Sequence, residues 1–309
     1  PVVLCHGFPE SAYSWRHQLL ALAAAGYHVL APDQRGYARS SRPANVTEYG
    51  IDQLCGDLLA LLDDVGAEQG VFVGHDWGAL IVWELAKLFP ERVKAVVGVS
   101  VPFVMWPGRP TELMKMLYGD RFFYILYFQQ VGPAERELEA DPRHTMAKTL
   151  WGASGLGFSS VTRPSSTAAL PPMDGTGFLT MMPEPPTLTA STPYPGPEEP
   201  WLTLADLDVY ADQFAASGFF GPVSYYRNLD ANFDRVKDLP ATRVSMPSYF
   251  IGGEQDPVLT MDPTGVERMG TVLPDYRGHT LIPGAGHWTQ QEAPRQFNDA
   301  LLGFLRTLD

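Results

Sequence analysis

The stretch Val71-Phe72-Val73-Gly74-His75-Asp76-Trp77-Gly78 decides the fold of this 309-residue chain. Apolar residues precede Asp76 and a helix-forming run over residues 79–86 follows it, which predicts a strand, a sharp turn and a helix. Gly74 and Gly78 stand two residues before and after Asp76, so the backbone can turn tightly and hold the aspartate in a strained conformation clear of the sheet. The pattern is typical of a nucleophile elbow, here with a carboxylate as the exposed group.

A carboxylate at this position changes the chemistry that the elbow can perform. Most such elbows present a serine, which attacks acyl carbons, whereas Asp76 would attack an sp³ carbon and form an alkyl ester of the enzyme. Water can then hydrolyse this ester at the carbonyl carbon of the aspartate. Epoxide opening and carbon–halogen cleavage both fit this scheme.

Composition narrows the class of protein. A hydrophobic content of 45% is ample for a buried core, and the net charge of −13 argues against nucleic acid as a partner, because that binding needs clustered Lys and Arg. No apolar run approaches the roughly 18 residues of a membrane helix, so we expect no transmembrane span. The oligomeric state stays open, with a homodimer as one alternative.

The two cysteines, Cys5 and Cys55, form neither a disulfide framework nor a metal-ligand cluster. We expect buried free thiols, a cytoplasmic location, and neither a metal nor an organic cofactor. The chain begins at Pro1, directly on the strand-like residues 2–5, so we also expect that an upstream segment is missing.

The order of predicted elements indicates an α/β architecture. Strands and helices alternate with short connections up to the strand at residues 95–99, which predicts a mostly parallel sheet with helices on both faces. From residue 102 the composition shifts to Trp, Met, Tyr and Pro, and strands resume only near residue 248. We therefore predict a core of residues 1–102 and 238–309 and an inserted, mainly helical lid of residues 103–237, with a long Pro-rich loop over residues 163–200.

A base and an acid for Asp76 follow late strands of the predicted sheet. His287 lies in a glycine-flanked loop, Gly284-Ala285-Gly286-His287-Trp288, where a neutral imidazole could activate water. Asp256 follows the preceding strand and would orient His287, with Glu254 as its competitor. The order nucleophile, acid, histidine is typical of the hydrolase-fold pattern.

Two backbone N–H groups complete the predicted site. The residue after the nucleophile is Trp77, and the loop His6-Gly7-Phe8-Pro9-Glu10 after the first strand offers Phe8. We expect the N–H groups of Phe8 and Trp77 to form an oxyanion hole.

Several motifs together resemble the α/β-hydrolase-fold epoxide hydrolases of the soluble type, with actinobacterial members as the nearest in pattern. The resemblance covers essentially the whole chain and rests on His6-Gly7-Phe8-Pro9-Glu10, Gly74-His75-Asp76-Trp77-Gly78, Tyr124-Ile125-Leu126-Tyr127-Phe128-Gln129, Gly221-Pro222-Val223-Ser224-Tyr225-Tyr226-Arg227-Asn228 and Gly286-His287-Trp288-Thr289-Gln290.

The resemblance implies further features that residue patterns alone do not select. It implies an epoxide and water as substrates, and two lid tyrosines, Tyr124 and Tyr226, that donate hydrogen bonds to the epoxide oxygen. It implies substrate contacts from Phe8, Trp77 and Trp288, and a cis peptide bond before Pro9. Members of the family usually carry two strands before the one that begins this sequence, so we expect those strands to belong to the missing upstream segment.

Two other functions compete with epoxide hydrolysis. A haloalkane or haloacid dehalogenase would share the fold, the aspartate and the histidine, but would need halide-binding donors, for which the indoles of Trp77 and Trp288 are candidates. A non-catalytic ligand receptor on the same fold is the second alternative, although the full set of Asp76, Asp256 and His287 argues against it.

Overall fold

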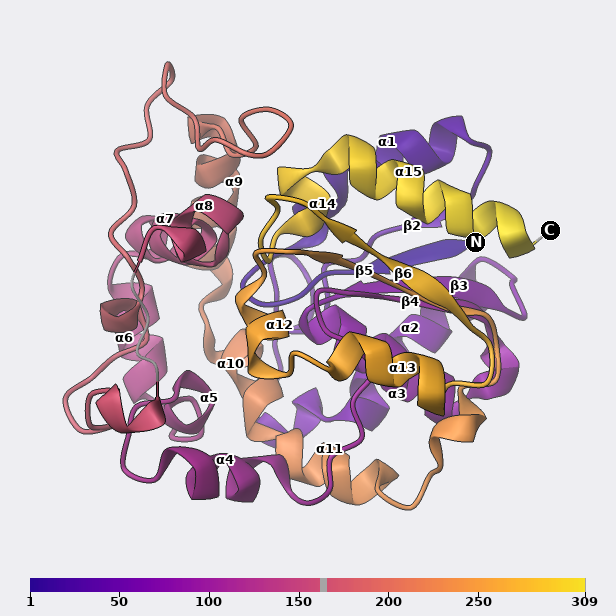
Figure 1. The fold of residues 1–309 in the computed structure, drawn as a ribbon, viewed down its shortest axis with the longest axis horizontal. Coiled ribbons are helices and arrows are strands. Elements are labelled where there is room, and N and C mark those ends of the chain that lie inside the picture. Colours follow the sequence, from indigo (N-terminus) through magenta and orange to yellow (C-terminus); the bar gives the residue numbers. More distant parts are fainter. Residues whose placement is uncertain (162–165, 309) are drawn as a thin grey trace.

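A six-stranded parallel sheet forms the centre of the computed structural model, which describes residues 1–161 and 166–308. The strand order is β2-β1-β3-β4-β5-β6, and helices cover both faces (Figure 1). No helix within the described ranges has the length and apolar character that crossing a bilayer requires. The strands are β1 (Val2–Cys5), β2 (Val29–Leu30), β3 (Gly70–His75), β4 (Val93–Val99), β5 (Ser248–Gly253) and β6 (Tyr276–Ile282).

The side-chain alternation of the strands divides the core into two layers. On β1, Val2 and Leu4 face α1 (Arg16–Ala24) and α15 (Pro294–Leu305). The intervening Val3 and Cys5 face the opposite layer, which holds α2 (Ile51–Asp64), α3 (Trp77–Leu88) and α13 (Gly265–Val272). Because both faces of the strands are covered, β1 and β3 are buried along their whole length.

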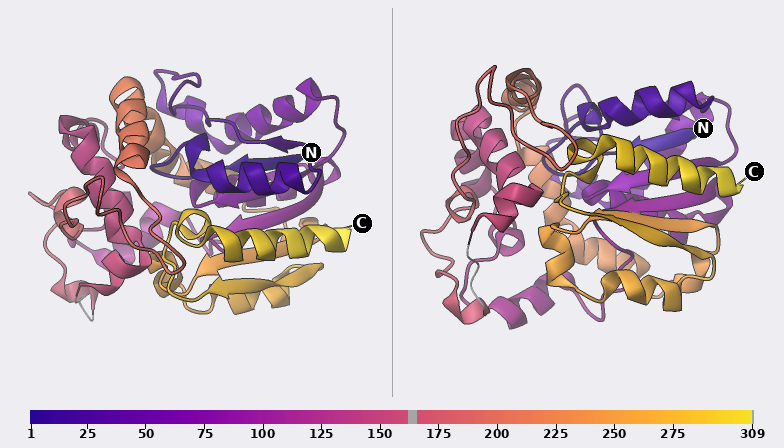
Figure 2. Two further views of the ribbon diagram at one scale, coloured as in Figure 1. Left: turned by 90° about the horizontal axis from the view of Figure 1, so that it is seen from above. Right: turned by 45° about the horizontal axis from the view of Figure 1, so that its top comes forward.

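Most of the helices between β4 and β5 lie beyond the carboxyl ends of the strands, at the end of the molecule opposite both termini, whereas the last of them, α11 (Leu229–Val236), packs beside α3 (Figures 1 and 2). These helices are α4 (Pro110–Tyr118), α5 (Tyr124–Tyr127), α6 (Pro133–Ala140), α7 (Pro142–Ala153), α8 (Gly155–Ser159), α9 (Leu204–Ser217), α10 (Phe220–Arg227) and α11. The two short helices of the later core are α12 (Pro257–Met261) and α14 (Thr289–Glu292). Single 3₁₀ turns are η1 (Ala12–Trp15), η2 (Val46–Tyr49), η3 (Pro90–Arg92), η4 (Thr167–Ala169), η5 (Leu179–Met181), η6 (Ala241–Arg243) and η7 (Arg306–Leu308).

The sequence predicts a helix over residues 203–217, capped by Thr203 and ended by Gly218, and α9 has these boundaries. Its N-cap Thr203 accepts the Asp206 N–H while the Asp206 carboxylate accepts the Thr203 N–H, which is a capping box. Gly218 ends the helix with φ +69°, a value that glycine adopts without strain. The long loop that precedes α9 contains only η4 and η5 over residues 166–200, and residues 163–165 of the predicted loop lie outside the described residues.

At three places the structure differs from what the sequence pattern predicts, namely a strand over residues 27–31, a helix over residues 122–129, and Asp52 as the cap of the helix that stops at Gly66. The strand expected over residues 27–31 is only Val29–Leu30, because the Tyr27 N–H donates to the end of α1 at Leu22 O. The helix expected over residues 122–129 is the single turn α5, since Phe122 N–H donates to Pro171 O and draws the start of the segment into an extended pairing. Asp52 does not cap α2, because the N-cap is Gly50.

Candidate active site

The predicted elbow joins β3 to α3. Asp76 has φ +53° and ψ −116°, a strained conformation for a residue with a side chain. The two glycines allow close approach: a Cβ on Gly74 would overlap the Gly78 carbonyl oxygen, and one on Gly78 would overlap the Cys5 carbonyl oxygen. The strain therefore lies at Asp76 itself, and the glycines let neighbouring backbone pack tightly around it.

The two oxygens of the Asp76 carboxylate have different partners. Oδ1 accepts the Phe8 N–H at 2.7 Å, and Oδ2 lies 3.5 Å from His287 Nε2. The Phe8–Pro9 peptide bond is cis, as the resemblance implied. Trp77 is the first residue of α3, so its N–H has no partner within the helix. Both predicted oxyanion donors thus belong to backbone next to Asp76.

His287 and Asp256 meet behind Asp76, as the strand ends predicted. His287 Nδ1 lies 3.0 and 3.2 Å from the two oxygens of the fully buried Asp256 carboxylate. Asp256 is also the N-cap of α12, where it accepts the Val258 N–H at 2.8 Å. Glu254, the competing acid, is exposed. The geometry therefore favours Asp256 as the partner of His287.

The charges of this cluster stabilise one another. Burial alone would lower the pKa of His287, but Asp256 and Asp76 raise it well above its usual value. Burial alone would raise the pKa of Asp76, yet the hydrogen bond and charge of His287 bring it below its usual value. The two carboxylates therefore favour the protonated form of His287, and His287 favours the ionised form of Asp76.

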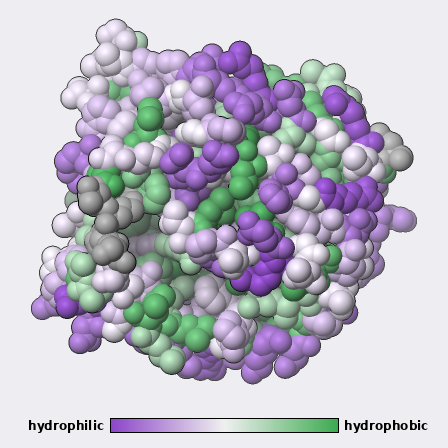
Figure 3. All heavy atoms as spheres, viewed as in Figure 1, coloured by the Kyte–Doolittle hydropathy of each residue, from purple (hydrophilic) through white to green (hydrophobic). Residues whose placement is uncertain are grey.

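A cavity of about 340 Å³ opens above Asp76 and His287, between the helical region that follows β4 and the residues at the carboxyl ends of the strands. Figure 3 shows this face of the molecule hollowed between the two parts, with apolar side chains beside the hollow. Met261 lines the cavity and is 52% exposed, so the cavity reaches solvent there. Most of the lining is aromatic or aliphatic, including Tyr118, Phe122, Phe123, Phe158, Leu170, Phe178, Met181, Met182 and Val258.

Tyr124 and Tyr226 both line this cavity, and their ring centroids are 5.8 Å apart. Their sequence neighbours are engaged elsewhere: the Tyr225 hydroxyl donates to Arg35 O at 2.7 Å, and Tyr127 is not among the described residues that line the cavity. Burial, and then the charge of Asp76, raise the pKa values of Tyr124 and Tyr226. Both phenols therefore keep their protons and can donate hydrogen bonds.

One glutamine connects the two tyrosine-bearing helices. The Gln129 side-chain amide donates to Ile125 O in α5 at 2.9 Å and to Tyr226 O in α10 at 3.0 Å. The Tyr226 ring also packs edge-to-face on Phe8 and Trp77, with centroids at 5.4 and 5.1 Å. Gln129 thus ties the helices that carry the two phenols to each other, and the Tyr226 ring also packs against Phe8 and Trp77.

The tryptophans of the site differ from one another. Trp288 lines the cavity, but its indole N–H donates to Leu150 O at 2.7 Å. The Trp77 side chain is not among the described residues that line this cavity, and its ring packs on Tyr225 and Tyr226 instead. The substrate contact expected from Trp77 is therefore limited to its backbone, and neither indole is positioned as a free donor toward the cavity.

A buried polar cluster behind His287 was missed by the sequence analysis. His75 Nδ1 lies 2.6 Å from the Glu10 carboxylate, and His75 Nε2 donates to the His287 carbonyl oxygen at 2.8 Å. Ser100 Oγ donates to the same carbonyl at 2.8 Å. The side-chain amides of Gln290 and Gln291 complete the shell around Glu10. Polar residues at otherwise buried positions next to two site motifs were the available signal.

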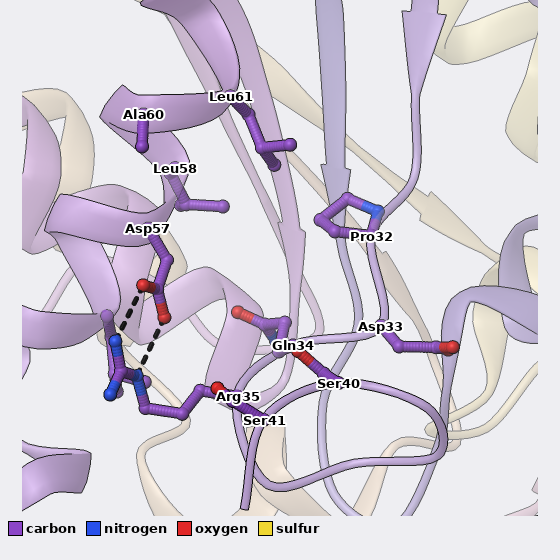
Figure 4. A pocket seen from close by; sticks show the side chains of 11 residues that line it. Pro32, Asp33, Gln34, Arg35, Ser40, Ser41, Asp57, Leu58, Ala60 and Leu61 are labelled. Atoms are coloured by element: carbon purple, nitrogen blue, oxygen red, sulfur yellow. Dashed lines mark hydrogen bonds and ion pairs between the residues drawn. The ribbon is translucent and has the colours of Figure 1, made fainter. Parts of the chain in front are cut away.

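A second cavity, of about 310 Å³, lies beside α2 and the turn after β2 (Figure 4). Its charged groups satisfy one another: Arg35 donates to both oxygens of Asp57, at 2.7 and 2.8 Å. Asp33 accepts the Ala12 N–H at 3.0 Å. The charged side chains that line this cavity therefore have partners within the protein.

Comparisons with known proteins agree on one family. Residues 1–129 match the alpha/beta hydrolase fold family. The whole chain is 46% identical to epoxide hydrolase A of Mycobacterium tuberculosis H37Rv, covering 91% of that protein. It is 42% identical to epoxide hydrolase B of the same strain, with 98% of this chain and 90% of that protein aligned. The crystal structure of epoxide hydrolase A from Mycobacterium thermoresistibile gives a TM-score of 0.88 at 46% identity, covering 100% of this chain and 91% of that one.

Proposed function

Because the chain belongs to the epoxide hydrolases of the α/β-hydrolase fold, we propose that it converts epoxides into vicinal diols through an ester on Asp76. One observation carries the proposal. The Asp76 carboxylate has one oxygen held by the Phe8 N–H and the other facing His287, and it opens into a cavity that two phenols also line. We assign residues 103–237 to a lid that supplies those phenols.

In the first step, Asp76 Oδ2 attacks a ring carbon of the epoxide. The carbon–oxygen bond of the ring breaks, and negative charge develops on the departing oxygen. Tyr124 and Tyr226 donate hydrogen bonds to that oxygen, which lowers the barrier because they are already oriented in a largely apolar cavity. The departing oxygen takes a proton from one of these phenols, which regains a proton when His287 releases its own, and the product of this step is a hydroxyalkyl ester of Asp76.

In the second step, water hydrolyses the ester. His287 Nε2 takes a proton from a water molecule that attacks Cγ of Asp76, while Asp256 holds the other ring nitrogen. The N–H groups of Phe8 and Trp77 stabilise the oxyanion that forms on Oδ1. Cleavage of the bond between Cγ and Oδ2 releases the diol, whose leaving oxygen takes the proton held by His287. The new carboxylic acid of Asp76 then gives its proton to His287 and is a carboxylate again.

Ester formation itself prepares His287 to act as a base. In the free enzyme the charges of Asp256 and Asp76 both raise the pKa of His287. The ester carries no charge, so one of the two groups that favour the imidazolium is lost when Asp76 reacts. His287 can then release its proton and accept another from water.

The alternative functions have less support. A dehalogenase would need indole N–H donors in the cavity, but the Trp288 indole is bonded to Leu150 O, and Trp77 is not among the described residues that line the cavity. A non-catalytic receptor would not require an aspartate that is held in a strained conformation and faces a histidine, as Asp76 does. We retain the cytoplasm as the proposed location, since Cys5 and Cys55 are free thiols.

Removing the nucleophile tests this proposal. For Asp76→Ala we expect kcat/KM for diol formation from styrene, stilbene or fatty-acid epoxides to fall by about 10⁴-fold or more. Asp52→Asn, at an exposed position on α2, is the matched control and should keep wild-type turnover. Wild-type activity in Asp76→Ala would refute the mechanism, and halide release from chloroalkanes by the wild type would favour the dehalogenase.

A further inference from the structure

Glu292, the last residue of α14, carries a buried carboxylate whose partners are backbone N–H groups. Its Oε2 accepts from Gly155 N at 2.9 Å and Gly286 N at 3.1 Å, and its Oε1 accepts from Trp288 N at 3.1 Å. The residue is 1% exposed. A buried carboxylate is costly unless its oxygens are hydrogen-bonded, so these three bonds are what allow it to stay there.

Two of the three N–H groups flank His287, and the third belongs to the lid. Gly286 and Trp288 are the residues immediately before and after His287, while Gly155 is the first residue of α8. The backbone segments around Gly155 and Gly286 lie in close contact at this point. A Cβ on Gly286 would overlap the Gly155 nitrogen, and a Cβ on Gly155 would overlap the Gly284 carbonyl oxygen. One carboxylate therefore links both sides of the histidine to the lid.

Neighbouring bonds strengthen the same junction. The His287 N–H donates to Ala153 O at 2.9 Å, and the Trp288 indole donates to Leu150 O at 2.7 Å, so the end of α7 also holds this loop. Burial raises the pKa of the Glu292 carboxyl to about 7, although the three backbone N–H groups lower it. Only the ionised form accepts at both oxygens without presenting a donor to an N–H group.

We propose that Glu292 is a positioning residue for ester hydrolysis, which fixes the backbone on both sides of His287 and ties it to lid helix α8. This inference rests on the proposed function, because it matters only if His287 activates water against an Asp76 ester. The Nε2 atom must stay within reach of a water beside Cγ of Asp76, and the free enzyme already holds it 3.5 Å from Oδ2. Small displacements of such a base have large kinetic effects.

A carboxylate of the lid, Glu198, gives a matched control. Glu198 accepts the N–H groups of Arg295 and Gln296 at 3.1 and 2.8 Å, at the start of α15. Its side chain is 5% exposed, and it also links the lid to the core. Neither of its N–H partners is adjacent to His287. Replacing Glu198 therefore removes a similar connection without touching the histidine loop.

The test measures ester formation and ester hydrolysis separately. In Glu292→Gln the side-chain NH₂ must face at least one of the three N–H groups, so the loop shifts. We expect the rate of ester hydrolysis to fall by about 10- to 100-fold while ester formation stays near the wild-type rate. Rapid-quench intact mass should then show the ester accumulating. Glu198→Gln should keep the wild-type ratio of the two rates, whatever it does to thermal stability.

Glu292→Asp gives a second test of the same contacts. If Glu292→Gln does not fold, Glu292→Asp retains the charge with a shorter reach and should show the same slower hydrolysis to a lesser degree. The downfield proton NMR signal of the His287 Nδ1–H should shift in either variant and stay unchanged in Glu198→Gln. An unchanged ratio of rates in folded Glu292 variants would overturn this inference alone. Absence of any ester in the wild type would instead contradict the proposed function.

Discussion

The core side and the lid side of the cavity are held by different interactions. On the core side, directed hydrogen bonds hold each reacting group: Asp76 to Phe8 N, His287 to Asp256, and the His287 carbonyl to His75 and Ser100. On the lid side, the rings of Tyr124 and Tyr226 lie in an aromatic cluster with Phe128 and Phe178, at centroid distances of 5.1 to 5.8 Å.

The two kinds of interaction suit the two steps of the proposed mechanism. Hydrogen bonds fix an atom's position and direction, whereas ring packing fixes a plane and leaves the hydroxyl free to rotate. Under the proposed mechanism, the core side must hold a base and a water against one carbon atom. The lid side must only bring two O–H groups to an oxygen whose position varies with the epoxide. We therefore expect the rate of ester hydrolysis to be the more sensitive to the loss or displacement of one group. The rate of ring opening should fall less steeply when one group is changed.

The largest effect that separates the two sides should come from His287→Gln. Ester formation needs no base, so we expect it to persist, while ester hydrolysis falls by about 10²- to 10⁴-fold. Intact mass after mixing with an epoxide should show one substrate mass added to the protein. His144→Gln, at an exposed position on α7, should behave as the wild type. Equal loss of both steps would show that the two sides are not separable.

The lid side should give the opposite pattern. Tyr124→Phe and Tyr226→Phe should each slow ester formation by about 10²-fold, because each removes one donor to the developing alkoxide. The rate of ester hydrolysis should stay unchanged, as measured by decay of preformed ester. The matched control is Tyr225→Phe, which leaves Arg35 O unpaired and should cost about 1 to 2 kcal/mol of stability with little loss of rate. Slower hydrolysis in either lid variant would contradict this division.

A smaller effect concerns pH. His287 is the base only when neutral, so ester hydrolysis should rise with pH through the pKa of His287 in the ester. That pKa should be lower than the pKa of His287 in the free enzyme, because the ester lacks the Asp76 charge that raises it. Single-turnover rates against pH, compared with an NMR titration of the free enzyme, measure both values. An equal or higher pKa in the ester would show that Asp76 does not influence His287.

The two sides also differ in how far the sequence predicted them. The α/β-hydrolase fold is confirmed, and the core residues follow from patterning: parallel strands end at one edge, so polar residues after β3, β5 and β6 must gather there. Spacing could not select the lid residues. Tyr225 and Tyr226 are adjacent on α10, and only their tertiary surroundings send one hydroxyl to Arg35 O and the other ring to the cavity.

Other features were beyond sequence reasoning for similar reasons. Glu292 has the pattern of an ordinary acidic helix end, and its role depends on Gly155, 137 residues away in the chain. The Trp288 indole could have faced a ligand until the fold brought Leu150 O to it. Each case depends on the partner that a side chain meets after long-range packing, which residue order alone does not specify.

The central claim, a covalent ester on Asp76, is tested most directly by a single turnover in ¹⁸O-labelled water with enzyme in excess over epoxide. Because water attacks Cγ of Asp76, the released diol should carry no label and the peptide that contains Asp76 should gain one ¹⁸O atom. Label in the first diol, with none in the peptide, would mean that water attacks the epoxide directly and would contradict the mechanism.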